Sequence, residues 1–172
     1  MKDLTQKTAF EFLADEVYLP GYMLLASEDY DKKGATFNFN VREPPVVRGD
    51  IIHYLTPRGL HICISQANYT LVEYMVREGL LEGLEVQRLR ETVLEGRCKI
   101  TELYQKFRKE IGLLKPIQGR FDIERFRLGK LPVFKLNFGF ANDAITGNLV
   151  SVIAPRPVPQ TNADIIRFNH SL

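Results

Sequence analysis

Several side chains that can donate, accept or transfer a proton gather in one short stretch of the chain. They are Tyr54, Thr56, His61, Ser65, Gln66, Asn68 and Tyr69. Most of them fall at the start of an apolar segment, His61 to Leu81, whose spacing predicts one long helix. The first N–H groups of a helix have no partner inside it, so they suit a developing oxyanion or a bound carbonyl. The stretch therefore predicts carbonyl chemistry at this end of the helix.

Asn68 stands apart from the other polar residues of this predicted helix. A helical wheel shows one polar stripe, formed by Gln66, Thr70, Glu73 and Arg77. Asn68 lies nearly opposite the stripe, and His61 and Ser65 precede it on that side. A buried amide without a partner costs about 1–3 kcal/mol, so backbone, water or a ligand must satisfy Asn68.

A purely structural interpretation of these residues is also open. Ser65 could cap the helix, His61 could be a hydrogen-bonded core histidine, and Asn68 could brace a neighbouring backbone. This interpretation is favoured for any one residue taken alone. Several polar side chains converging on one end of a buried helix favour a site.

The sequence contains none of the common enzyme motifs. His53, His61 and His170 have no partners at zinc-ligand spacing, and there is no nucleophile elbow, phosphate loop or dinucleotide fingerprint. We therefore expect no metal and no cofactor. A net charge of +2, from 23 basic and 21 acidic residues, gives no argument for nucleic acid or membrane binding.

A basic run further along the chain is a second candidate site. Lys106 and Arg108 would share one face of a strand, with Lys109 beside them and Arg120 and Arg125 nearby. Such a patch suits the phosphates of coenzyme A or the phosphopantetheine of a carrier protein; a solvated strand face is the alternative. An aromatic stripe predicts core packing, or the lining of an acyl tunnel: Phe134, Phe138 and Phe140.

The elements before the long helix are short. Residues 8–18 predict a helix with a capping box formed by Thr8 and Glu11. Residues 22–26 and 36–41 predict strands, separated by a charged turn. Residues 44–60 predict a long loop, in which Gly49, Pro57 and Gly59 act as breakers. Two free cysteines, Cys63 and Cys98, are expected to be buried.

The last part of the chain predicts β-structure. A short helix ending at Gly96 should follow the long one, and residues 98–111 have a spacing that favours helix over strand. Three alternating runs then predict an antiparallel meander, at residues 120–128, 132–141 and 146–154, with turns at Gly129-Lys130 and Asn142-Asp143. We expect one domain over residues 1–155 and an extended tail over residues 156–172.

Three pieces of the chain resemble the FcoT-like family of long-chain acyl-CoA thioesterases. They are residues 16–30 (EVYLPGYMLLASEDY), 60–81 (LHICISQANYTLVEYMVREGLL) and 104–123 (YQKFRKEIGLLKPIQGRFDI). The resemblance implies an α+β hotdog fold, with an antiparallel sheet wrapped around one long central helix. It also implies that Cys98 to Ile111 is a strand, against the periodicity, and that the protein is a homodimer or a dimer of dimers.

The resemblance implies a function in acyl-thioester processing. Tyr18 matches the family's N-terminal tyrosine, and Ser65 stands where the family has an asparagine. The family's loop asparagine falls near Leu55 or Thr56, and its loop tyrosine falls near Val47 or Arg48, so both are replaced here. The resulting hypothesis is a thioesterase acting on fatty acyl-CoA or acyl carrier protein. The alternatives are a non-catalytic acyl-binding protein and a hotdog enzyme of another type, such as a hydratase.

These arguments yield two sets of candidate residues. The catalytic set is Tyr18, His61, Ser65 and Asn68. The substrate-binding set is Tyr54, Thr56, Gln66, Lys106 and Arg108. The N-terminus lacks the apolar core of a signal peptide, so a cytoplasmic location is expected.

Overall fold

The computed structural model describes residues 5–19, 21–31, 33–41, 46–47, 50–51, 54–81, 83–127 and 131–154. The helices are α1 (Ala9–Phe12), the π-helical turn η1 (Leu13–Val17), α2 (Pro57–Arg77) and α3 (Val86–Leu94). The strands are β1 (Leu25–Tyr30), β2 (Gly34–Phe39), β3 (Val46–Val47), β4 (Asp50–Ile51), β5 (Cys98–Phe107), β6 (Ile117–Arg127), β7 (Val133–Phe140) and β8 (Ile145–Ile153). The predicted tail, residues 156–172, and the predicted turn at Gly129-Lys130 lie outside the described residues.

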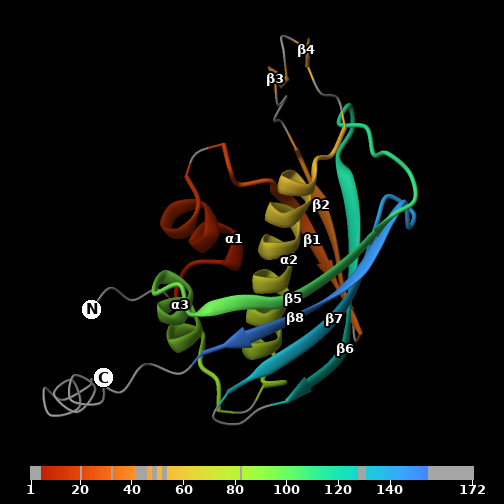
Figure 1. Ribbon diagram of the computed structural model, residues 1–172. Helices are drawn as coiled ribbons and strands as arrows, with labels where there is room; N and C mark the ends of the chain where they lie inside the picture. The colour runs from red at the N-terminus through yellow and green to blue at the C-terminus, as the bar shows by residue number, and fades with distance from the viewer. Residues whose placement is uncertain are drawn as a thin grey trace, which may run out of the picture.

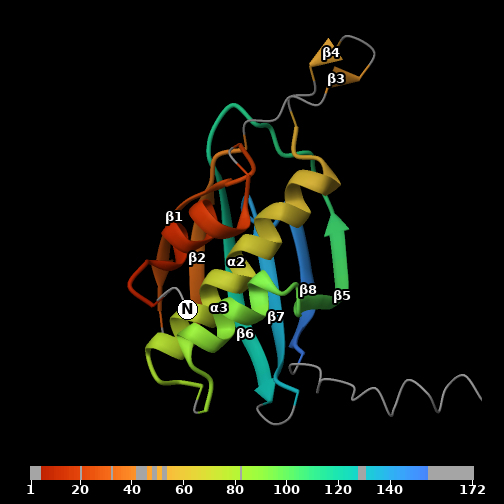
Figure 2. The same ribbon diagram turned by 90° about the vertical axis from the view of Figure 1, so that its left-hand side faces the viewer.

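One sheet of six strands curls around α2. Its strand order is β1-β2-β6-β7-β8-β5, and every neighbouring pair is antiparallel. Figure 1 shows α2 against the concave face of the sheet, with α1 and α3 on the far side of α2. Figure 2 shows α2 crossing the strands obliquely, with β5 at one edge of the sheet. The expected α+β hotdog fold is confirmed.

The long helix begins earlier than its apolar pattern predicted. Thr56 is the N-cap, because its Oγ1 accepts a hydrogen bond from the N–H of Gly59 at 3.1 Å, and Pro57 occupies the first turn. Proline fits there because its missing N–H would have no partner in the helix anyway. Reading Pro57 and Gly59 as helix breakers was therefore wrong. The polar stripe is also enclosed: Gln66, Thr70 and Glu73 are all buried.

Two strands correct the sequence-based boundaries. The strand predicted at residues 22–26 is β1, which runs from Leu25 through part of the predicted charged turn to Tyr30. An edge strand tolerates such charges because one of its sides has no partner strand. Residues 98–107 form β5, which pairs with β8 along its length, so the resemblance was right and the helical spacing misleading.

The predicted meander is confirmed as β6, β7 and β8. Phe134, Leu136 and Phe140 face α2 and are almost fully buried, so the aromatic stripe belongs to the core. A register shift between Ile123 and Arg125 supplies the bulge that the side-chain pattern of β6 required. Among the described residues, no helix has the length and apolar content that crossing a bilayer requires.

Candidate functional site

A cavity of about 440 Å³ lies between α2, the start of β5 and the N-terminal helical segment. Its lining residues are Leu13, Val17, Tyr18, His61, Ser65, Asn68, Tyr69, Val93, Cys98, Lys99 and Ile100. All four members of the predicted catalytic set line it. The cavity thus unites residues that are far apart in the sequence, because η1, α2, α3 and β5 all contribute to its lining.

One face of α2 supplies the polar side of this cavity. His61, Ser65 and Asn68 are four and three residues apart, so they lie above one another on the helix surface. His61 is exposed, Ser65 is half-buried and Asn68 is buried. The exposure of these polar side chains therefore decreases along the helix, from His61 to Asn68.

The start of α2 does not supply the donors that the sequence predicted beside Ser65. Because α2 starts at Pro57, Ser65 lies about 12 Å further along the helix axis. The N–H groups around Ser65 and Asn68 belong to the interior of the helix, where they bond to backbone carbonyls. Ser65 is therefore not a capping residue, and the N–H groups of α2 beside it are not available as donors to the cavity.

The side chain of Asn68 has a defined orientation. The Ser151 hydroxyl, on β8, donates to Asn68 Oδ1 at 3.0 Å, and both residues are buried. Among the described residues this is the one hydrogen bond of the Asn68 carboxamide. Asn68 Nδ2 therefore remains available as a donor beside the cavity that Asn68 lines.

Replacing Ser151 with alanine should destabilise the protein. The change leaves the buried Asn68 carbonyl without a donor, and such a loss costs about 1–3 kcal/mol. Urea unfolding of Ser151→Ala should show this decrease in the free energy of unfolding. The matched control, Ser27→Ala on the exposed side of β1, should stay within about 0.5 kcal/mol of the parent protein. Equal values for both variants would contradict a structural role for the Ser151 bond.

Tyr18 enters the cavity from the end of η1 as a neutral hydroxyl. Burial raises the pKa of Tyr18 to about 12, and the nearby Cys63 and Cys98 add to this effect. Burial also raises the pKa of the Cys98 thiol to about 11. At neutral pH both groups keep their protons. Tyr18 is then suited to donate a hydrogen bond, and Cys98 is unsuited to act as a thiolate nucleophile.

The protein should lose stability in alkaline solution, partly through Cys63. This thiol is fully buried, and burial raises its pKa from 9.0 to about 12. The folded chain therefore holds this proton more tightly than the unfolded chain. The resulting stabilisation is fully present below about pH 9 and is lost as the pH rises toward 12. Urea unfolding at several pH values should show a shallower loss above pH 9 for Cys63→Ala than for the parent. Parallel curves would contradict this contribution of Cys63.

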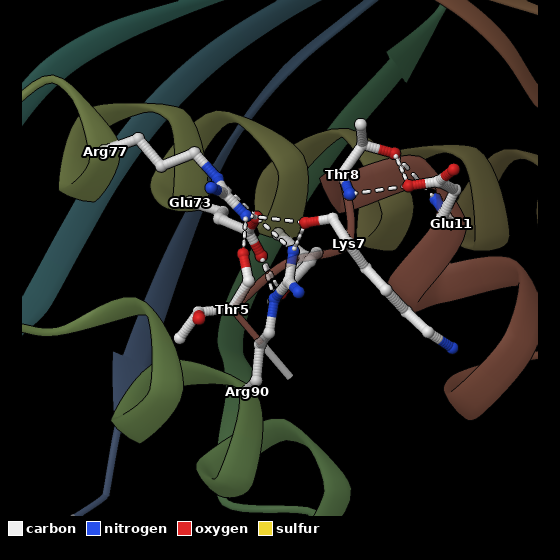
Figure 3. A network of polar contacts seen from close by, with 8 residues as sticks. Thr5, Lys7, Thr8, Glu11, Glu73, Arg77 and Arg90 are labelled. Atoms are coloured by element: carbon white, nitrogen blue, oxygen red, sulfur yellow. Dashed lines mark hydrogen bonds and ion pairs between the residues drawn. The ribbon is translucent and has the colours of Figure 1, made fainter. Parts of the chain in front are cut away.

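A buried ion pair behind the cavity holds the N-terminal segment in place. Arg90 on α3 donates to Glu73 on α2 through Nε at 2.8 Å and Nη2 at 2.5 Å, and both side chains are fully buried. Arg77 donates to the same carboxylate at 2.9 Å. Figure 3 shows these three side chains converging beside the backbone of Thr5 and Lys7.

This network reaches both the N-terminal segment and the cavity. The Lys7 carbonyl accepts hydrogen bonds from Arg90 at 2.9 Å and Arg77 at 2.8 Å, directly before the capping box of α1. On the other side, the Tyr69 hydroxyl donates a short hydrogen bond to Glu73. The ring of Tyr69 packs on Phe12 and lines the cavity. The buried pair therefore positions one wall of the cavity.

Two residues of the predicted substrate-binding set have structural roles outside this cavity. Gln66 braces the chain before and within β1: its Oε1 accepts from the N–H groups of Leu24 and Leu25, and its Nε2 donates to the Tyr22 carbonyl. Thr56 caps α2. Neither residue lines the cavity.

A second cavity, of about 420 Å³, brings together two other members of that set. Tyr54 and Arg108 line it, together with Leu55, Pro57, Phe107, Lys109, Glu110, Ile111 and Ile145. It lies where β5 ends and α2 begins, and its lining is largely apolar with cations among the exposed residues. Lys106 is exposed on β5, two residues before Arg108. Arg120 belongs to another region, because it pairs with Asp31 and Asp122.

Some residues important to the cavity were absent from the predicted sets. Ser151 could have been suspected, because it is a polar residue at an inward-facing position between Leu149 and Ile153. Glu73 and Arg90 are separate in the sequence, and no local pattern predicts their pairing. Among the described residues, no cluster of histidine, cysteine and carboxylate side chains could hold a metal ion.

Comparisons with known proteins support the fold. No protein-family model and no curated protein sequence matches the chain. A candidate thioesterase from Shewanella oneidensis has a similar structure, with a TM-score of 0.58, 7% sequence identity, and coverage of 86% of this chain and 95% of that chain. A candidate thioesterase from Syntrophus aciditrophicus has a TM-score of 0.53, 11% identity, and coverage of 86% and 94%. At such low identity, the likeness concerns the fold alone.

Proposed function

We propose that the protein is a thioesterase that hydrolyses a fatty acyl thioester in the cavity beside Asn68. The observation that carries the proposal is the Asn68 carboxamide: Ser151 holds its oxygen, which leaves its N–H₂ group free to donate toward the cavity. Two candidate thioesterases share the fold, which adds support. The resemblance to FcoT-like proteins suggests a long acyl chain.

The reaction requires no covalent bond between the enzyme and the acyl group. Asn68 Nδ2 and the neutral Tyr18 hydroxyl would donate to the thioester carbonyl oxygen, where negative charge develops as water attacks the carbon. The exposed imidazole of His61 would accept a proton from the attacking water. The carbon–sulfur bond then breaks, and His61 returns a proton to the departing thiolate. The products are a carboxylic acid and a free thiol.

The second cavity would bind the polar end of the substrate. Arg108 and Lys109 are exposed cations beside the half-exposed ring of Tyr54. Guanidinium and ammonium groups suit phosphate oxygens, and the ring offers a face for a nucleobase. The first cavity touches the start of β5 and the second touches its end, so an extended thioester could lie along this strand.

We also propose that the protein is a homodimer formed along β5. This strand is an edge of the sheet, is ten residues long, and exposes Tyr104 and Phe107. A long edge of this kind is prone to pair with another strand. Gln105 adds a second argument, because its Oε1 is buried without a hydrogen-bond partner among the described residues. A second subunit could supply that donor.

Charges placed on β5 should break this dimer. Sedimentation equilibrium of the parent protein should give twice the mass of one chain. The double variant Tyr104→Lys/Phe107→Lys should raise the dimer dissociation constant by about tenfold or more, because it forces cations into the interface. The control Leu80→Lys, which alters an exposed leucine after α2, should remain dimeric. A monomeric parent protein would contradict the proposal.

The proposed activity is tested by the release of free thiol from a panel of acyl-CoA esters of increasing chain length. We expect turnover that rises with chain length and produces one thiol for each carboxylic acid. Calorimetric binding of the same esters to the protein distinguishes the alternative. Binding without thiol release would contradict hydrolysis and identify a non-catalytic acyl-binding protein.

A further inference from the structure

A basic hollow lies on the outer face of the sheet, on the side turned away from α2. Its volume is about 310 Å³, and its lining residues are Arg125, Arg127, Val133, Lys135 and Val150. The register explains this grouping. Phe134 and Leu136 are buried toward α2, so their neighbours on β7, Val133 and Lys135, face outward.

The cations of this hollow are placed where they repel one another, which does not help the fold. Arg125 on β6 lies directly opposite Lys135 on β7, and Arg127 lies opposite Val133 on the same face. Like charges directly opposite one another in an antiparallel pair are destabilising. The bulge between Ile123 and Arg125 brings both arginines onto this face. Bulges often redirect side chains beside functional sites.

The acidic groups around the hollow leave a positive excess. Glu124 pairs with Lys135 at 2.8 Å, and this hydrogen bond lowers the pKa of Glu124. Glu102 lies on β5, one strand further away, where it is opposite Val150 of β8. Neither Arg125 nor Arg127 forms an ion pair with the described residues. Two guanidinium groups therefore remain to bind an anion.

We propose that this hollow binds a phosphate monoester that carries an apolar group. The planar guanidinium groups of Arg125 and Arg127 match the oxygens of a phosphate through paired charge-assisted hydrogen bonds. Val133 and Val150 form an apolar floor beside them, which the organic part of the ester would cover. The hollow is on the opposite face of the sheet from the Asn68 cavity, so this ligand is separate from the thioester.

Titration of the ¹⁵N-labelled protein with phenyl phosphate and with inorganic phosphate, at constant ionic strength, tests this site. The amide signals of Arg127, Val133, Lys135 and Val150 should move and saturate. Phenyl phosphate should bind roughly fivefold more tightly than phosphate, the effect of about 40 Å² of buried apolar surface. The double variant Arg125→Gln/Arg127→Gln should weaken phenyl phosphate binding about tenfold or more.

A second double variant provides the matched control. Arg88→Gln/Lys115→Gln removes the same charge from exposed positions outside the hollow and should change binding by less than about twofold. Equal weakening by the two double variants would overturn the proposal, since it would mean general attraction to a basic protein. Equal affinity for phosphate and phenyl phosphate would also overturn it. Neither measurement depends on thioester hydrolysis, so the proposed thioesterase activity and this site can fail independently.

Discussion

Asn68→Ala should lower kcat for acyl-thioester hydrolysis by about 10²–10³ while the protein remains folded. The variant removes the donor that we place on the carbonyl oxygen, and losing one such donor in other hydrolases has an effect of this size. The measurement is the rate of thiol release at saturating substrate. It should be made well below the unfolding temperature, because Asn68→Ala also deprives Ser151 of its acceptor.

Two companion variants separate the proposed role of Asn68 from its structural role. Ser151→Ala keeps the Asn68 amide but releases its oxygen, so kcat should fall less than in Asn68→Ala. Asn137→Ala removes an exposed amide on β7 and should leave kcat within about twofold. If folded Asn68→Ala hydrolyses the thioester at the parent rate, Asn68 has no part in the reaction and is only a brace between α2 and β8.

Glu73→Ala should be the most destabilising single substitution among those considered. It leaves the fully buried guanidinium of Arg90 without its carboxylate, and breaking a buried pair from one side costs about 3–5 kcal/mol. For a chain of this size, the unfolding temperature should fall by about 10 °C. Thermal and urea unfolding measure both quantities. The cavity should also loosen, because Tyr69 and the N-terminal segment lose their anchor.

A double-mutant cycle shows whether the pair itself is responsible. Glu73→Ala/Arg90→Ala should cost less than the two single substitutions added together, by about 0.5–3 kcal/mol, because neither charge is then left alone. Arg88 is an exposed arginine on α3, the helix that carries Arg90, and Arg88→Ala should change stability by less than about 0.5 kcal/mol. Strict additivity of Glu73→Ala and Arg90→Ala would contradict the coupling.

Alternation and turn residues were enough to predict much of the sheet. The run that became β7 carries buried aromatic and aliphatic side chains at every second position, and the runs that became β6 and β8 do so over part of their length. The segment that became β5 was ambiguous, because an exposed edge strand has only one partly buried face. Ile100 and Leu103 alone do not distinguish period two from period 3.6. Family resemblance resolved this segment, and periodicity did not.

The candidate site was predictable where its residues lie on one helix. His61, Ser65 and Asn68 share a face of α2 whatever the exact start of the helix. Tyr18 was assigned through the resemblance, and the structure places it in the same cavity. Contacts such as Ser151 with Asn68 depend on how β8 lies across α2, which no local pattern contains. The start of α2 was misplaced because Pro57 was taken as a breaker.

The most direct test of the thioesterase proposal is a crystal structure with a long-chain acyl-CoA analogue in which a methylene replaces the thioester sulfur. Such a molecule keeps the carbonyl but cannot be hydrolysed. We predict that its carbonyl oxygen lies about 2.7–3.1 Å from Asn68 Nδ2, with the phosphates near Arg108. A carbonyl bound away from Asn68, or an acyl chain seated in the second cavity, would contradict the proposed site.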